Sequence, residues 1–285
     1  MNTKITLTLL AFMIFSIQTN AQQKANYGSN RGRYVEVQGI KLYYEEYGAG
    51  VPLLLLHGGL SSIRGFSSVI PELSKHFRVI AVDAPGQGRS EQSHTLSFKS
   101  MASHYSEMID KLGLDSVYVY GFSLGGITAL HLAANRPDKV KMVVAHSAVT
   151  HLDGYNEGFG NSDQMTTEEV EKYADWWLEG HRKHSPQPDQ WKKFINDLRT
   201  IWRPSNLVPD SVLQQVKAKS LILLGDSDII HPEHAIKMRQ KLAESHLCIL
   251  PGTTHFALWE NPQDLLSVIL SFLQNRQKPE YQLAY

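Results

Sequence analysis

Short, mainly apolar segments recur along this chain, and they constrain its fold more than any other feature. They span 53–56, 77–82, 117–120, 140–145, 221–224 and 247–250. Helix-length segments separate most of them, at 98–112, 124–135, 234–243 and 262–275. Gly39, between two short apolar runs, also predicts a turn and thus a hairpin over 34–44. Strands buried on both faces and separated by helices predict an α/β fold, with a mostly parallel sheet covered on both sides.

One stretch, from 149 to 216, departs from this alternation. It has no buried-strand segment, and four of the five tryptophans fall within it, at 176, 177, 191 and 202. Segments 168–178 and 188–202 have the pattern of amphipathic helices. We therefore expect a helical cap or lid, inserted into a core formed by 22–148 and 217–285. Most of its tryptophans are expected to join cap to core, and Trp176, Trp177 and Trp202 are candidates for the wall of a substrate pocket.

The first 21 residues are typical of a secretory signal peptide. Lys4 gives a short positive start, residues 5–17 are almost entirely apolar, and the small residue Ala21 follows at a position suited to cleavage. The apolar run is too short to cross a membrane as a helix, which needs ~20 residues. We expect the mature protein to be exported, periplasmic or secreted, and not attached to a membrane. An amphipathic N-terminus that is retained is the alternative.

The charge balance and the cysteine content exclude some kinds of binding partner. The chain has 28 Lys+Arg and 28 Asp+Glu, so its composition provides no basic face for nucleic acid. A single cysteine, Cys248, can form neither an internal disulfide nor a cysteine-based zinc cluster, and it lies in a predicted core strand. We expect a small-molecule substrate, whereas the oligomeric state is left open.

The candidate chemistry lies in Gly121-Phe122-Ser123-Leu124-Gly125-Gly126. This segment follows one apolar run and opens a helix-length segment, so Ser123 is expected on a sharp turn from strand to helix. Such a turn strains the backbone and requires small neighbours two residues away. It raises the hydroxyl above the sheet at a helix N-terminus, where positive potential favours a developing oxyanion. Ser123 is therefore the candidate nucleophile.

With this motif, further segments resemble the α/β-hydrolase family, and the resemblance covers nearly the whole chain after residue 21. His57-Gly58-Gly59-Leu60 resembles the family's loop that donates one oxyanion N–H, and segment 83–90 resembles the turn after the next strand. The resemblance implies an α/β-hydrolase fold with an inserted helical cap. It also implies an oxyanion hole formed by the N–H groups of Leu124 and of Gly59 or Leu60.

The same resemblance selects the base and the acid. Of thirteen histidines, His255 lies in the turn after the last predicted strand, where the family has its catalytic histidine. The pattern Gly-x-x-Asp selects Asp228 as the acid, and Asp226 is the alternative. The other acid position used in the family follows the strand ending at His146, and it offers no carboxylate nearer than Asp153.

The resemblance implies hydrolysis of a carboxylic ester of a small or medium acyl group through an acyl-enzyme, with no metal or organic cofactor. Serine in place of aspartate at the nucleophile position argues against the epoxide hydrolase and haloalkane dehalogenase branches. Carbon–carbon bond hydrolysis, lactone opening, aminopeptidase action and cofactor-free haloperoxidase-like activity use a similar triad and are alternatives. A ligand-binding, receptor-like protein with slow turnover is a further alternative.

Overall fold

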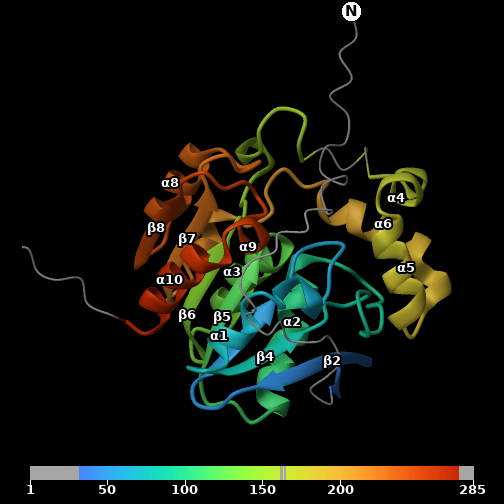
Figure 1. Ribbon diagram of the computed structural model, residues 1–285, viewed down its shortest axis with the longest axis horizontal. Coiled ribbons are helices and arrows are strands. Elements are labelled where there is room, and N and C mark those ends of the chain that lie inside the picture. Colours follow the sequence, from blue (N-terminus) through green and yellow to red (C-terminus); the bar gives the residue numbers. More distant parts are fainter. Residues whose placement is uncertain (1–31, 161–162, 164, 276–285) are drawn as a thin grey trace, which may run out of the picture.

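The strands form one sheet in the order β1-β2-β4-β3-β5-β6-β7-β8 (Figure 1). This computed structural model describes residues 32–160, 163 and 165–275. The strands are β1 (Arg33–Val37), β2 (Ile40–Tyr47), β3 (Pro52–Leu56), β4 (Arg78–Val82), β5 (Val117–Phe122), β6 (Val140–His146), β7 (Lys219–Gly225) and β8 (Ser245–Leu250). The first two form a hairpin that joins β4 antiparallel, and β4, β3 and β5–β8 run parallel to one another.

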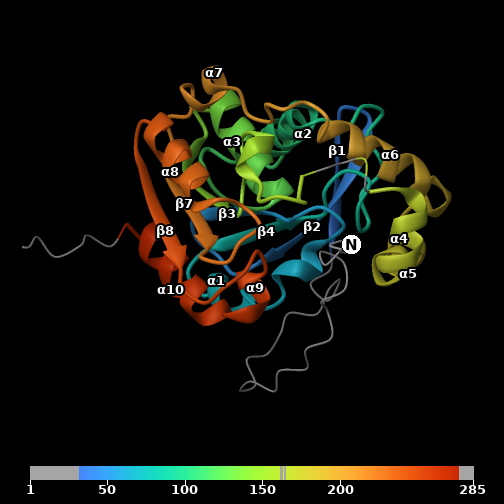
Figure 2. The same cartoon turned by 90° about the horizontal axis from the view of Figure 1, so that it is seen from above.

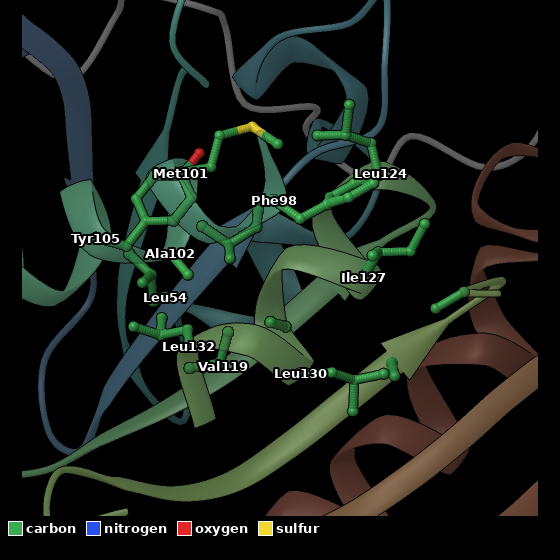
Figure 3. Close-up of a cluster of buried hydrophobic side chains, with 14 of the residues drawn as sticks. Leu54, Phe98, Met101, Ala102, Tyr105, Val119, Leu124, Ile127, Leu130 and Leu132 are labelled. Carbon is green, nitrogen blue, oxygen red and sulfur yellow. The ribbon is translucent and has the colours of Figure 1, made fainter. Parts of the chain in front are cut away.

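Helices cover both faces of the sheet because alternate strand residues point to opposite sides. In β3, Leu54 and Leu56 join the cluster that includes α2 (Phe98–Lys111), α3 (Leu124–Asn135) and α8 (Pro232–Lys241). Leu53 and Leu55 join the other cluster, with α1 (Ile70–Leu73), α9 (Ala257–Glu260) and α10 (Pro262–Leu273). Figure 2 shows the two helix layers above and below the sheet. Figure 3 shows α2 and α3 side chains packed together over the strands. The prediction of an α/β fold with helices on both faces is confirmed.

The order of the central strands gives the sheet a topological switch point. β3 lies between β4 and β5, so the chain leaves β3 toward one neighbour and later returns to its other side. Loops that follow parallel strands on the two sides of such a switch point diverge at the carboxyl edge, and ligands bind there in open α/β sheets. The loops after β3, β5, β6, β7 and β8 all meet this edge.

The described residues between β6 and β7 form helices and turns. The helices are α4 (Thr167–Tyr173), α5 (Asp175–His184), α6 (Trp191–Ile201) and α7 (Asp210–Leu213), with 3-10 turns η2 (Leu152–Gly154) and η4 (Pro188–Gln190). Helices α4, α5 and α6 pack beside one another, away from the sheet (Figure 1). The expected helix over 168–178 is broken at Ala174, whose φ of −129° and ψ of 32° are not helical and which caps α4. The boundaries of a separate cap stay a prediction.

The two ends of this insertion are joined by backbone hydrogen bonds. The carbonyl of Thr150 accepts the N–H groups of Leu207 and Val208, at 2.9 and 3.0 Å, and Leu152 N–H donates to Ser205 at 2.8 Å. The chain therefore leaves and re-enters the core at one place.

The predicted signal peptide over 1–21 lies outside the described residues, and export stays a prediction. Within the described residues, none of the helices has the length and apolarity that a membrane crossing requires. Cys248 lies in β8 and is half-buried, packed against the α10 side of the sheet.

Candidate active site

Ser123 connects β5 to α3 with a backbone conformation that side-chain-bearing residues rarely adopt. Its φ is +53° and its ψ is −118°, and its N–H donates to the carbonyl of His146 at 2.8 Å. The flanking glycines make the turn possible. A Cβ on Gly121 would lie 2.2 Å from the Gly125 carbonyl oxygen, and one on Gly125 would lie 2.0 Å from that of Leu56. The turn predicted from the sequence therefore forms for the steric reason expected.

His255 and Asp228 reach Ser123 from two other loops. His255 lies between β8 and α9, with Nε2 3.2 Å from Ser123 Oγ. Its Nδ1 lies 2.8 Å from Asp228 Oδ1, in the turn after β7. Because a carboxylate only accepts, Nδ1 carries the proton and Nε2 is free to accept the Ser123 hydroxyl proton. The structure thus brings the three residues selected from the sequence into one hydrogen-bonded chain.

The Asp228 carboxylate is buried, with 0% of its side chain exposed. Burial alone would raise its pKa, but hydrogen bonds from His255 and Ser147 and the nearby His255 charge outweigh burial and hold the pKa below its ordinary value. Oδ1 also receives the N–H of Ile230 at 3.3 Å. Asp228 is therefore charged over the neutral pH range and can stabilise an imidazolium.

The alternative acid, Asp226, faces another way. Its carboxylate is exposed and accepts the N–H groups of Gly252 at 2.9 Å and Thr253 at 3.3 Å. These backbone hydrogen bonds hold its pKa below the ordinary value. Asp226 therefore shapes the turn that leads into His255 and does not meet the imidazole ring.

The predicted oxyanion loop lies directly against the nucleophile. A Cβ on Gly58 would lie 3.4 Å from Ser123 Cβ, and one on Gly59 would lie 3.8 Å from the Leu124 side chain. Leu60 has a positive φ of 49°. Leu124 is the first residue of α3, and N–H groups in a first helical turn have no acceptor within the helix. The loop after β3 therefore lies beside the start of α3, and the oxyanion role of Gly59, Leu60 and Leu124 stays a prediction.

His57 holds this loop in place. It is buried, its Nδ1–H donates to the Gly58 carbonyl at 2.8 Å, and its Nε2 accepts Ala84 N–H at 2.9 Å. Burial lowers its pKa to about 4, so the ring is neutral at pH 7. The neighbouring Asp83 carboxylate accepts the N–H groups of Ile63 and Arg89, both at 2.8 Å. His57 and Asp83 therefore hold the loops that follow β3 and β4 in place through backbone hydrogen bonds.

The three candidate pocket tryptophans lie in different surroundings. Trp176 is 40% exposed. Trp177 is buried inside the insertion, stacked 5.6 Å from the Phe194 ring of α6. Trp202 meets the Phe98 ring edge-on at 5.4 Å, in the cluster that also holds Leu124 (Figure 3), and its Nε1–H donates to the Tyr155 hydroxyl at 3.1 Å. Of the three, Trp202 is the one with a ring contact to α2 in the core.

Ser147 is a site residue that the sequence reasoning missed. Its hydroxyl donates to Asp228 Oδ2 at 2.5 Å. Asn156 also contacts the turn after β7, donating its Nδ2–H to the Asp228 backbone carbonyl at 2.9 Å. The available signal was the position of Ser147, one residue after β6, where the family's other acid position lies. Among the described residues, the structure holds no group of three or more His, Cys, Asp or Glu side chains placed to bind a metal.

A serine, a histidine and an aspartate, hydrogen-bonded in that order at the carboxyl edge of a parallel sheet, define an α/β protein of the serine-triad class. The family model described as alpha/beta hydrolase fold matches residues 51–180. The chain therefore has the α/β-hydrolase fold, and its similarity to that family agrees with the resemblance seen in the sequence.

Curated relatives match over most of their length. A 2-hydroxy-6-oxo-2,4-heptadienoate hydrolase of Pseudomonas putida is 27% identical over 272 residues, covering 87% of this chain and 98% of the relative. The AB hydrolase superfamily protein YisY of Bacillus subtilis is 28% identical over 266 residues, covering 85% and 98%. Among solved structures, a serine hydrolase involved in carbazole degradation has a TM-score of 0.71 at 24% identity, covering 86% of this chain and 99% of that one. That structural likeness concerns the fold.

Proposed function

We propose that this protein is a serine hydrolase that cleaves carboxylic esters of small or medium acyl groups through an acyl-enzyme. The observation that carries the proposal is the continuous hydrogen-bonded chain from Ser123 through His255 to Asp228. The strained turn at Ser123 and the glycine-containing loop beside it support the same reaction. Similarity to hydrolases over most of the chain agrees with it.

The steps follow from the positions of the protons. Ser123 Oγ attacks the acyl carbonyl carbon while its proton moves to His255 Nε2, and Asp228 stabilises the imidazolium. The negative oxygen of the tetrahedral intermediate receives N–H groups from Leu124 and from Gly59 or Leu60. His255 then gives its proton to the departing alcohol. Water, deprotonated by the same ring, releases the acid and restores Ser123.

The triad proposal predicts that Ser123→Ala abolishes hydrolysis of a p-nitrophenyl ester series from acetate to octanoate. We expect a loss of kcat of about a thousandfold or more, because the nucleophile is removed. The control is Ser220→Ala, since Ser220 is buried in β7 and donates to the Ala218 carbonyl, away from the triad. Full activity in Ser123→Ala, with circular dichroism unchanged, would exclude Ser123 as the nucleophile.

A second candidate is carbon–carbon bond hydrolysis of a 2-hydroxy-6-oxo-2,4-dienoate. The observation that favours it is the full-length similarity to hydrolases named for such compounds in Pseudomonas putida and Metapseudomonas resinovorans. The 6-oxo group also offers Ser123 a carbonyl carbon. Loss of the dienoate's absorbance, measured beside the ester series, separates the candidates. A kcat/KM for the dienoate above that for every ester would replace the ester proposal.

A further inference from the structure

The two oxygens of the Asp228 carboxylate have different side-chain partners. Oδ1 faces His255 Nδ1 at 2.8 Å, and Oδ2 receives the Ser147 hydroxyl at 2.5 Å. This second distance is that of a strong, charge-assisted O–H···O⁻ hydrogen bond. Ser147 is itself buried, with 2% of its surface exposed. The hydroxyl therefore meets the acid in an environment from which water is excluded.

The backbone at Ser147 is held in an unusual conformation. Its φ is +49°, and its N–H donates to the Leu223 carbonyl of β7 at 2.7 Å. Among the described residues, positive φ without glycine occurs at Gln38, Leu60, Ser123, Ser147 and Asn275. Three of these follow the adjacent strands β3, β5 and β6, at the oxyanion loop, the nucleophile and Ser147. Strained residues cluster at functional sites, which places Ser147 with the other two.

No other hydrogen-bond donor to Oδ2 is present among the described residues. The Ile230 N–H reaches Oδ1, and the Asn156 amide reaches the Asp228 backbone carbonyl. The titratable groups that influence the carboxylate are His255 from the β8–α9 loop, His146 from β6 and Tyr155 after η2. Burial lowers the pKa of His146 to about 3, so that ring supplies no charge at neutral pH. Without Ser147, a buried charged oxygen would have no donor.

We propose that Ser147 is a positioning residue of the triad: its hydroxyl anchors Asp228 Oδ2, and so keeps Oδ1 aimed at His255 and the carboxylate charged. This inference rests on the proposed function for its kinetic consequence. Ser147 touches no reacting atom and acts through Asp228 alone. Its substitution should therefore change the rate of the chemical step and its pH dependence, and leave substrate binding unchanged.

The kinetic experiment compares Ser147→Ala, Ser147→Gly and the buried-hydroxyl control Ser220→Ala on a p-nitrophenyl ester. We expect kcat to fall about tenfold in both Ser147 variants, with KM unchanged, because a hydrogen bond to a charged group is lost. The acidic limb of kcat/KM should move to higher pH in both. Glycine accepts positive φ without strain, so normal activity in Ser147→Gly alone would assign the effect to the backbone and overturn the proposal.

A second measurement does not depend on turnover. The Asp228 carboxyl carbon is followed by ¹³C NMR against pH, and Asp228→Asn identifies its signal. We expect its titration midpoint to rise in Ser147→Ala and Ser147→Gly and to stay constant in Ser220→Ala. Constant midpoints in all variants would overturn the inference. A protein that hydrolyses no ester but shows the shift would contradict only the proposed function.

Discussion

At the scale of single residues, two aspartates separated by one position have opposite surroundings. Asp228 is buried and bonded to His255, whereas Asp226 is exposed and bonded to the backbone of residues 252 and 253. Both carboxyl groups have a pKa below the ordinary value, so the pKa direction does not distinguish them. The geometry distinguishes them, because only the carboxylate of Asp228 contacts the His255 imidazole.

Comparison of Asp228→Asn with Asp226→Asn tests this assignment. Asparagine at 228 keeps the shape of the side chain but can donate to Nδ1, which favours the wrong imidazole tautomer. We expect kcat to fall about a thousandfold in Asp228→Asn. In Asp226→Asn, where only a turn is weakened, the fall should be less than about tenfold. Steady-state ester kinetics on both variants would measure this, and a larger loss at Asp226 would reverse the roles.

At the scale of elements, the sequence predicted most of what local sterics and hydrophobic patterning determine. The strand-to-helix turn at Ser123 could be predicted because Gly121 and Gly125 are needed at fixed spacing. The break between α4 and α5 was missed, because the amphipathic pattern continues through Ala174. Ser147 was missed for another reason. A serine after β6 becomes meaningful only once the register of β6 and β7 brings it beside Asp228, and no local pattern encodes that pairing.

The helical insertion gives a prediction about its tryptophans. Trp177 packs on Phe194 within the insertion, so Trp177→Ala should lower the free energy of unfolding by about 3 kcal/mol. Trp202 contacts Phe98 of α2 in the core, so Trp202→Ala should raise KM for longer acyl esters several-fold more than Trp177→Ala does. Urea unfolding and ester kinetics separate the two effects. Equal changes in KM would contradict a pocket role for Trp202.

At the scale of the whole molecule, buried neutral histidines tie stability to pH. Burial lowers the pKa of His57 and of His234 to about 4 and that of His146 to about 3. The unfolded chain binds these protons below pH 6.5, whereas the folded protein does not. The folded state is therefore at full stability above pH 6.5 and loses it as the pH falls toward 4.

We expect the free energy of unfolding to fall by about 1 kcal/mol for each such histidine and each pH unit below 6. Urea titrations at pH 7, 6 and 5 measure the slope. His234→Gln should reduce it, since glutamine can accept the Thr150 N–H that His234 receives at 3.0 Å. Exposed His94→Gln is the control. An unchanged slope in His234→Gln would contradict the account.

The hydrogen bonds that join the two ends of the helical insertion also determine how the length of the insertion can vary. Residues 150–152 and 205–208 are already hydrogen-bonded to each other, so the distance between the ends of the insertion is independent of its length. Lengthening a loop whose ends are fixed costs little free energy, since the entropy of closure grows only with the logarithm of length. The insertion can therefore be replaced by one of another length, while the strands that hold Ser123, Asp228 and His255 keep their places.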